Sequence, residues 1–516
     1  MVLGGYCPLF PGESIMLSVI LDKNFTIGEL DRRLFGTFVE HMGRCVYTGI
    51  FEPGHPTADE NGFRQDVLDL VKELGPTIVR YPGGNFLSGY NWEDGVGPVE
   101  SRPKRLDLAW FSTETNQFGT NEFVRWCQQA NVEPMFGVNL GTRGPDEARQ
   151  FLEYCNHPSG TTLSDLRKQH GFSKPHGIKL WYLGNEMDAP WQICGKTATE
   201  YGRIALETAK VMKWVDPSLT LAVCGSSGRS MPMFGSWEHE VLQHIFKHVE
   251  FLSIHMYFEN EYNDPKEFLA NSDVMDRYIK EVVAVCDAVA GEQRSPKRMM
   301  LSFDEWNVWY KSRSEADVRK PGWPEAPPLI EEVYDLQDAL VVGSALITLM
   351  NNADRVKLAC LAQLVNVIGA IMTEKGGPAW RQTIFHPFSQ AAQFGHGIVL
   401  TPNLRSTTYH TKTADEVNHI SASAVYDNNR HVTLFILNRE LKQLSDFQID
   451  LRSFGHVESI EAWQLTGSDL RATNTRETPD CIKPEKNLMV TQKKFGAQVR
   501  LQPASWNVVR MMIGSP

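Results

Sequence analysis

The sequence predicts a (β/α)8 TIM barrel followed by an antiparallel, jelly-roll-like β-sandwich domain. Short apolar runs alternate with longer amphipathic stretches from about residue 30 to residue 385. After residue 386 the runs become short and alternating, and turn residues separate them. The first pattern is typical of parallel strands joined by helices, and the second of a sandwich. The chain has 516 residues, which favours one large domain plus a smaller one.

Eight apolar runs predict the barrel strands. They span 33–39, 76–81, 133–139, 178–184, 218–224, 249–255, 298–304 and 355–361. Amphipathic stretches between them predict helices over 61–74, 119–130, 145–156, 197–214, 237–247, 265–290 and 330–351. A doubly wound open sheet is the competing topology. It usually carries a glycine-rich nucleotide loop after its first strand, and the sequence has none there.

The remaining segments complete the domain prediction. Residues 1–14 combine Gly, Pro and apolar residues without a period, so we expect a leader or tag. Residues 15–29 are expected to supply an N-terminal strand to the sandwich, because chain termini often meet in space. The catalytic barrel then spans 30–385 and the sandwich 386–516. Its strands are predicted at 406–410, 420–426, 432–437, 447–451, 459–465, 488–492, 499–502 and 506–512.

Composition narrows the partners and the compartment. The net charge of -11 disfavours binding to a phosphate backbone, so no nucleic-acid partner is expected. The nine cysteines are scattered and form no Cys-x-x-Cys, which is typical of a reducing compartment. The N-terminus lacks the charged start of a signal peptide, and the apolar run 15–21 is too short to span a membrane. We therefore expect a cytoplasmic protein without a membrane partner.

Polar side chains gather at the carboxyl ends of the predicted barrel strands, the face on which barrel enzymes build their active sites. These residues are Glu40, His41, Arg80, Asn85, Asn185, Glu186, His255, Tyr257, Asp304, Glu305, Asn307, Gln363 and Asn366. Glu186 and Glu305 each end an apolar run. Two such carboxyl groups on one face indicate paired-carboxylate chemistry, of which glycoside hydrolysis is the commonest kind.

Several of these residues also have a structural interpretation. Asp188 and Asp304 are expected to cap helices, and Glu40 alone could be an ion-pair partner. His41 and His255 fit hydrogen-bonding supports as well as proton carriers. No His-Glu-x-x-His or His-x-His spacing occurs, so we expect neither a catalytic metal nor another cofactor.

Charge separates the roles of the two glutamates. One must carry a proton for the leaving oxygen, and the other must be ionised to attack the anomeric carbon. Arg80 is the one cation among the strand-end residues other than histidine, so it is predicted beside the nucleophile, where Tyr257 can also donate a hydrogen bond. Asn185 and Glu186 are adjacent, so both point into one pocket only if the strand kinks, which Gly184 permits.

Five segments together resemble the family 51 α-L-arabinofuranosidases of the glycosidase clan GH-A. They are 35–41, 80–86, 181–188, 304–307 and 362–366. The resemblance covers about residues 17 to 512. It implies a retaining, exo-acting glycosidase that removes terminal non-reducing α-L-arabinofuranosyl residues from arabinan, arabinoxylan and derived oligosaccharides. It also implies a homo-oligomer.

The resemblance also implies residue roles. Glu186 matches the acid/base and Glu305 the nucleophile, while Arg80 and Tyr257 match groups that orient the nucleophile. Residues expected to bind the substrate are Glu40, Asn85, Asn185, Gln363, Trp110, Trp309 and His255. Tyr81, Ala189 and Cys194 depart from the family pattern. The last two lie in the loop after the fourth strand, which is expected to shape leaving-group preference differently from the family.

Two alternatives stay open from the residues alone. Another clan activity, such as an endo-glucanase or xylanase, would need a crevice open at both ends, whereas an exo-enzyme needs a pocket one sugar deep. A non-catalytic sugar-binding barrel is disfavoured because both glutamates are present. A carboxyl separation of about 5 Å is expected for retention and about 8 Å for inversion.

Overall fold

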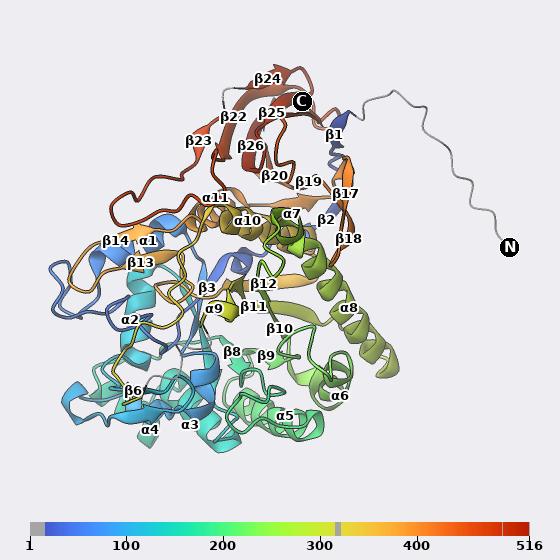
Figure 1. Cartoon of the computed structure of the whole chain (residues 1–516). Coiled ribbons are helices and arrows are strands. Elements are labelled where there is room, and N and C mark those ends of the chain that lie inside the picture. Colours follow the sequence, from blue (N-terminus) through green and yellow to red (C-terminus); the bar gives the residue numbers. More distant parts are fainter. Residues whose placement is uncertain (1–15, 315–320, 488, 515–516) are drawn as a thin grey trace.

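The computed structural model describes residues 16–314, 321–487 and 489–514. The predicted leader or tag at 1–14 lies outside the described residues, as does Leu488 at the start of one predicted sandwich strand. A barrel and a β-sandwich stack on each other, with the sandwich at the top in Figure 1. Among the described residues, no helix has the length and apolar character needed to cross a membrane.

The barrel is a closed ring of parallel strands, which confirms the predicted fold class. Its order is β10-β11-β12-β3-β4-β7-β8-β9. The strands are β3 (Gly36–Phe38), β4 (Ile78–Tyr81), β7 (Glu133–Val138), β8 (Leu180–Leu183), β9 (Thr220–Cys224), β10 (Phe251–Phe258), β11 (Met300–Val308) and β12 (Val356–Leu361). The first predicted strand is too long at its start. Residues Arg32–Phe35 form a 3-10 turn instead, because the Asp31 side chain accepts from the Arg33 amide and caps it.

Helices surround the barrel as the amphipathic pattern predicts. They are α1 (Gln65–Leu74), α2 (Thr120–Ala130), α3 (Pro145–Asn156), α4 (Thr162–Gln169), α5 (Ala198–Val215), α6 (Ser236–Ile245), α7 (Pro265–Leu269), α8 (Asn271–Glu292), α9 (Lys311–Ser314), α10 (Leu336–Asn351) and α11 (Phe385–Phe394). The single helix predicted over 265–290 is two helices that meet at Ala270. The helix predicted from 330 starts later, because Asp335 caps the amides of Gln337 and Asp338.

The sandwich contains two sheets that enclose their own apolar core. One sheet has the order β16-β1-β21-β25-β24 and the other β2-β15-β19-β20-β26-β22-β23. The strands are β1 (Leu17–Ile20), β2 (Thr26–Glu29), β15 (Ile398–Leu400), β16 (Asn403–Arg405), β19 (Ile420–Tyr426), β20 (His431–Asn438), β21 (Ser445–Asp450), β22 (Val457–Leu465), β23 (Glu485–Lys486), β24 (Val490–Lys493), β25 (Gly496–Leu501) and β26 (Ser505–Ile513). The N-terminal segment thus gives one strand to each sheet. The pair β1–β21 is parallel, an exception to the antiparallel prediction.

One predicted sandwich strand, 406–410, is placed elsewhere. Its residues belong largely to β17 (Thr408–Thr411), which pairs with β18 (Asp415–Asn418) in a separate two-stranded hairpin. Ala414 and Val417 of this hairpin pack against Ala270, between α7 and α8 of the barrel. Two further small sheets are also hairpins: β5 (Arg105–Asp107) with β6 (Ser112–Glu114), and β13 (Ile371–Thr373) with β14 (Ala379–Arg381).

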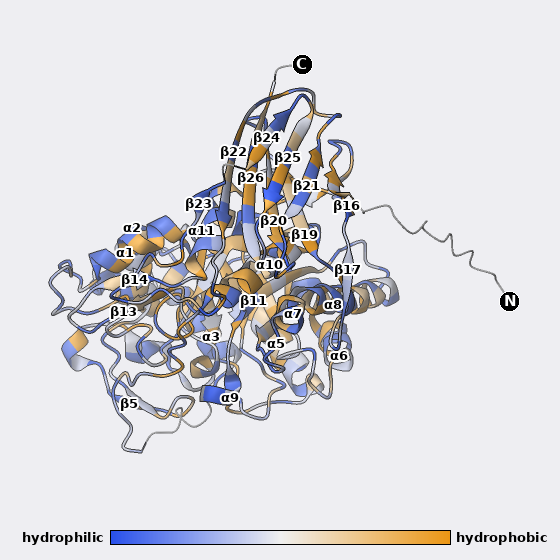
Figure 2. Cartoon of the chain, turned by 45° about the horizontal axis from the view of Figure 1, so that its top comes forward, coloured by the Kyte–Doolittle hydropathy of each residue, from blue (hydrophilic) through white to orange (hydrophobic). Residues whose placement is uncertain are grey.

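Helix α10 joins the two domains into one packed unit. It is buried along almost its whole length and lies between barrel and sandwich, as the apolar colouring in Figure 2 shows. A side chain at Gly343 would come within 2.6 Å of the Trp506 ring, so only glycine permits this close contact. Trp506 also donates through Nε1 to Gln390 Oε1 at 2.9 Å. The sandwich therefore packs against one side of the barrel, through α10 and α11.

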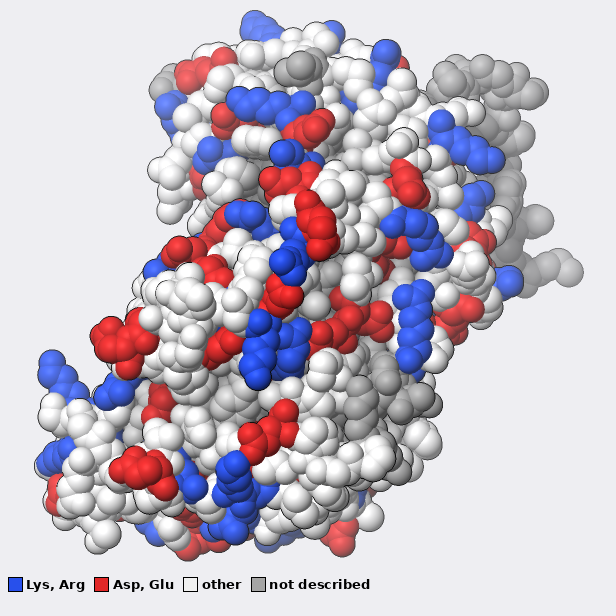
Figure 3. All heavy atoms as spheres, turned by 60° about the vertical axis from the view of Figure 1, so that its left-hand side comes forward, with Lys and Arg blue, Asp and Glu red and all other residues white. Residues whose placement is uncertain are grey.

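The surface has no strongly basic face in the view of Figure 3, where Lys and Arg lie beside Asp and Glu. This mixture follows from the composition of 51 basic and 62 acidic residues. It gives a phosphate backbone no continuous positive track on this side.

Candidate active site

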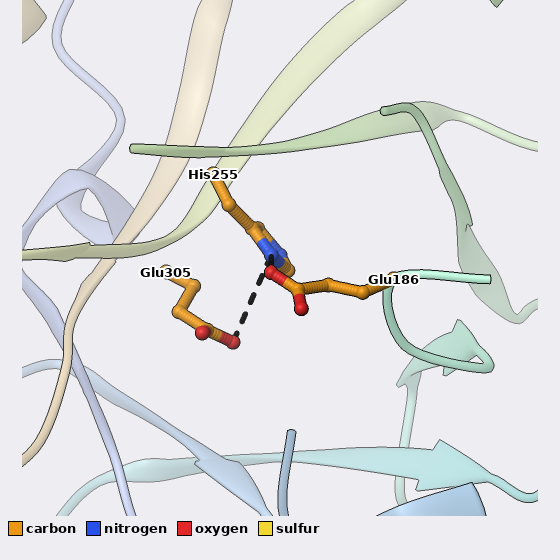
Figure 4. Close-up of side chains that lie close together, drawn as sticks. All are labelled: Glu186, His255 and Glu305. Atoms are coloured by element: carbon orange, nitrogen blue, oxygen red, sulfur yellow. Dashed lines mark hydrogen bonds and ion pairs between the residues drawn. The ribbon is translucent and has the colours of Figure 1, made fainter. Parts of the chain in front are cut away.

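Glu186 and Glu305 meet at the carboxyl ends of the barrel strands. Glu186 lies in the loop just after β8, and Glu305 lies within β11. Figure 4 shows their carboxyl groups and the His255 ring pointing toward one another. One ligand atom from each of the three residues lies within 4.8 Å of the other two. The nearest carboxylate oxygens of Glu186 and Glu305 thus lie no more than 4.8 Å apart, close enough to act on one bound sugar.

The backbone kinks where β8 ends. Gly184 has φ +83° and Glu186 has φ +46°, so the chain turns twice within three residues. The turn brings Asn185 and Glu186 to the same pocket, which an extended strand would prevent. Asn185 Oδ1 accepts from Arg80 at 2.5 Å, and its Nδ2 lies 3.4 Å from Asn85 Oδ1.

Arg80 and Tyr257 both contact Glu305. Arg80 Nη1 donates to Glu305 Oε2 at 2.7 Å, and the Tyr257 hydroxyl donates to Oε1 at 2.7 Å. The guanidinium is buried, with its Cζ 4.4 Å from the ring centroids of both Phe38 and Tyr182. Each carboxylate oxygen of Glu305 therefore has one fixed donor.

Asp304 is part of this network, and its predicted role as a helix cap is wrong. It lies inside β11, fully buried, 3.4 Å from Arg80 Nε. Its Oδ1 accepts from the Ser253 hydroxyl at 2.5 Å. Burial acts to raise the pKa of Asp304, but Arg80 and His255 outweigh it and lower the pKa. A second anion thus lies behind the nucleophile.

His255 connects the two glutamates. Its Nδ1 lies 3.0 Å from Glu186 Oε1 and 3.8 Å from Glu305 Oε2, and its Nε2 lies 3.6 Å from Asp304 Oδ1. Burial acts to lower its pKa, but the charge of Glu305 and the bonds to Asp304 and Glu186 raise it to about 10.

The pKa of Glu186 is correspondingly low. Burial acts to raise it, but the hydrogen bond and charge of His255 and the bond from Trp191 prevail. From the sequence we expected the available proton on Glu186. The lowered pKa of Glu186 and the raised pKa of His255 instead favour a proton on the imidazole. The difference arises because the His255 imidazole, on β10, lies 3.0 Å from Glu186, a distance that the sequence does not give.

Two predicted sugar-binding residues, Trp110 and Gln363, contact a third one, Glu40. Its Oε1 accepts from Trp110 Nε1 at 2.9 Å, and its Oε2 accepts from Gln363 Nε2 at 3.0 Å. Burial is the main cause that raises the pKa of Glu40 to about 7, and the negative charge of Glu305 adds to it. Gly84 lies between these carboxylates: a methyl group there would come 3.3 Å from Glu40 Oε2 and 3.4 Å from Glu305 Oε2. The backbone at Gly84 therefore forms part of the pocket wall.

Two aromatic residues shape the mouth of the pocket. Trp309, which the family resemblance implies as a substrate-binding residue, packs edge-on against Tyr257, with ring centroids 5.0 Å apart. Trp191 was missed from the sequence. It is 55% exposed and donates through Nε1 to Glu186 Oε2 at 2.9 Å. The sequence offered one signal for its role, because Trp191 lies only five residues after Glu186, in the loop that also carries Ala189 and Cys194.

His41 and Asp188 have supporting contacts. His41 lies between Glu114 Oε2, at 2.8 Å from Nδ1, and the Tyr81 hydroxyl, at 2.7 Å from Nε2. Asp188 accepts from the amide and hydroxyl of Ser227, so it fixes a neighbouring loop and does not cap a helix.

Among the described residues, one group of side chains combines ligand atoms at a spacing that a metal ion could use. Glu186, His255 and Glu305 offer the carboxylate and imidazole donors that divalent transition metals accept. The same atoms are already paired: Glu186 with His255, and Glu305 with Arg80 and Tyr257. A buried guanidinium within hydrogen-bonding distance of Glu305 opposes a cation there, which favours proton chemistry at this trio.

Comparison with known proteins identifies the family. A model of the α-L-arabinofuranosidase 1 domain matches residues 70–280, and one of the α-L-arabinofuranosidase C-terminal domain matches residues 304–505. A solved family 51 α-L-arabinofuranosidase from Bifidobacterium longum is 43% identical, with a TM-score of 0.93, covering 97% of this chain and 100% of that one. The chain belongs to the family 51 α-L-arabinofuranosidases.

Two other relatives carry names that state different glycosidic linkages. A Bacillus subtilis protein named intracellular exo-α-(1→5)-L-arabinofuranosidase 1 is 52% identical over 494 residues, covering 96% of this chain and 98% of that protein. A Bifidobacterium longum protein named exo-α-(1→6)-L-arabinofuranosidase is 48% identical over 514 residues, covering 97% and 98%. Similar identity to both shows that family membership alone does not decide the linkage.

Proposed function

We propose that the protein is a retaining, exo-acting α-L-arabinofuranosidase that works by double displacement. Its substrates are terminal non-reducing α-L-arabinofuranosyl residues on arabinan oligosaccharides, with arabinoxylan side chains as a second source. The observation that carries the proposal is the pair Glu186–Glu305, with carboxylate oxygens within 4.8 Å and Glu305 held by Arg80 and Tyr257.

In the first step Glu305 attacks the anomeric carbon. Arg80 and Tyr257 hold its two oxygens at 2.7 Å each, so the attacking group is oriented before the sugar arrives. Glu186 and His255 share one proton. As positive charge develops on the sugar, an imidazolium 3.8 Å from Glu305 becomes less favourable, and the proton moves through Glu186 to the leaving oxygen. The bond to the leaving oxygen breaks and the ester to Glu305 forms.

In the second step water hydrolyses that ester. Glu186 is now an anion and takes a proton from the attacking water. Glu305 leaves as a carboxylate, and its charge again favours a proton on the Glu186–His255 pair. The pair therefore gives one proton in the first step and recovers it in the second.

The pocket geometry supports exo action over the endo-glucanase and xylanase alternatives. Glu40 accepts hydrogen bonds from Trp110, from Gln363 and from the Phe86 amide, so these groups form a buried cluster beside the reacting centre. A main chain running through the site would have to pass this buried group. The same carboxylate and amide atoms suit the hydroxyls of one terminal furanose.

Relatives support two further parts of the proposal. The Bacillus subtilis protein is named for α-(1→5) linkages and for an intracellular location. This name supports the proposal that the substrates here are arabinan-derived oligosaccharides that have entered the cell. A homo-oligomer remains a prediction from the family resemblance, checked by light scattering.

The test follows hydrolysis of 4-nitrophenyl α-L-arabinofuranoside by proton NMR. We expect α-arabinofuranose as the first product, before mutarotation, because two inversions give net retention. Initial β-product would contradict the double displacement. Turnover of xylan or β-glucan main chains, without turnover of the arabinofuranoside, would favour the endo-acting alternative.

Replacing His255 tests the shared proton. The wild-type pair keeps its proton until pH rises through the raised His255 pKa of about 10. In His255→Asn the proton resides on Glu186 alone, so we expect the alkaline limb of kcat/KM to move to lower pH by about two units or more. His239→Asn is the matched control, since His239 pairs with Glu292 on the barrel exterior. An unchanged alkaline limb in His255→Asn would show that His255 only supports the fold.

A further inference from the structure

The cavity around Glu186 and Glu305 is larger than one sugar requires. Its volume is about 1240 Å³, above the roughly 300–1,000 Å³ usual for small-molecule sites. Its lining runs from Gln363 at the barrel centre to Thr413, in the β17–β18 hairpin that the sandwich domain contributes. A pocket for one furanose and the catalytic residues account only for the inner part of this cavity.

The hairpin is fixed to the barrel beside this cavity. The Lys412 amide donates to Glu267 Oε1 at 2.7 Å, and the Thr413 hydroxyl donates to Glu267 Oε2 at 3.3 Å. The Tyr409 hydroxyl donates to the Lys266 carbonyl at 3.1 Å. Glu267 is buried and lines the cavity itself, so the hairpin turn forms a built wall.

The outer wall carries groups that suit a sugar chain. Tyr262 is 46% exposed, and Lys412 Nζ lies 4.5 Å from its ring centroid, which holds the ring in place. An exposed aromatic face stacks on the apolar face of a sugar ring. Asn260 Nδ2, also in the lining loop, has no hydrogen-bond partner among the described residues. Glu261 and Asn271 add an acceptor and an amide to the same lining.

We infer that the one-sugar pocket continues as a groove that binds the second and later sugars of an α-linked arabino-oligosaccharide leaving group, with Tyr262 and the β17–β18 hairpin as its outer wall. This inference rests on the proposed function and extends it to the leaving-group side. The hairpin leaves the sandwich and packs on the barrel at Ala270, beside the cavity. Binding energy gained along this groove lowers the barrier at the distant anomeric carbon.

The experiment compares kcat/KM for α-(1→5)-linked arabino-oligosaccharides of two to five units with that for 4-nitrophenyl α-L-arabinofuranoside. We expect kcat/KM to rise about tenfold from the disaccharide to the tetrasaccharide. The double variant Tyr262→Ala/Lys412→Ala should lose about that factor on the tetrasaccharide and change less than about twofold on the nitrophenyl substrate.

A matched control exists on the sandwich. In the β24–β25 turn, Lys494 Nζ lies 5.0 Å from the ring centroid of Phe495, which repeats the Lys412–Tyr262 pairing. Neither residue is among those that line the cavity. Lys494→Ala/Phe495→Ala should leave every substrate unchanged. Equal kcat/KM at all chain lengths, or an equal loss on both substrate types in the Tyr262/Lys412 variant, overturns the groove.

Calorimetry on Glu305→Ala separates the groove from the reaction. Tighter binding of the tetrasaccharide than of the disaccharide, lost in the added Tyr262→Ala/Lys412→Ala background, supports the groove even if the wild type hydrolyses no arabinofuranoside. Absence of arabinofuranoside hydrolysis by the wild type would overturn the proposed function and leave the groove standing. Equal binding of both oligosaccharides overturns the groove.

Discussion

Glu305→Ala is expected to lower kcat on 4-nitrophenyl α-L-arabinofuranoside by on the order of 10⁵-fold, because no other group can form the glycosyl ester. The fold should survive the change. Arg80, which loses Glu305, keeps Asp304 at 3.4 Å and Asn185 at 2.5 Å. Circular dichroism and the melting temperature provide the check on folding.

Added azide identifies the role of Glu305. In the vacated space azide attacks the substrate directly, so the single inversion should give β-L-arabinofuranosyl azide, measured by NMR. Glu374→Ala is the control, since Glu374 pairs with Arg476 on the surface near β13 and β14. Normal turnover in Glu305→Ala, or an α-azide product, would remove Glu305 from the nucleophile role.

Glu186→Ala is expected to have an effect that depends on the leaving group. Loss of general acid catalysis should reduce kcat/KM about 10³-fold on an arabino-oligosaccharide. A nitrophenolate leaves without a proton, so kcat/KM on the nitrophenyl substrate should fall far less. Without a base for water, the glycosyl-enzyme should accumulate and give a burst of nitrophenol in rapid-mixing measurements.

The product formed with azide distinguishes Glu186 from Glu305. In Glu186→Ala, azide attacks the glycosyl-enzyme, so two inversions should give α-L-arabinofuranosyl azide and faster turnover. Asp188→Asn is the matched control, because Asp188 lies two residues away and contacts Ser227. An equal loss on both leaving groups, with no response to azide, would contradict the acid/base assignment.

The sequence predicted the barrel correctly because its signal is local. Apolar runs of strand length, separated by amphipathic stretches, place all eight barrel strands. The departures arise from contacts that periodicity cannot reveal. Residues 406–410 alternate like a sandwich strand, yet they join a hairpin that packs on Ala270, a residue far away in the sequence.

The catalytic face divides in the same way. Strand ends alone brought Glu186, Glu305, Arg80 and Tyr257 to one site, because parallel strands in a barrel all end on the same face. Trp191 was missed because an exposed loop has no periodicity to place its side chain. Asp304 was misread as a cap because its neighbours Ser253 and Arg80 come from other strands.

By itself the sequence determined the fold class, the family and the two carboxylates, since each depends on local pattern and on motifs within short segments. The tertiary structure alone showed which buried groups shift the pKa values of Glu186 and His255. Carboxylates from the end of β8 and from β11 meet at His255 on β10, and Coulomb interactions among buried groups depend on distance in space. Packing of the hairpin on the barrel likewise decided how far the cavity extends beyond one sugar.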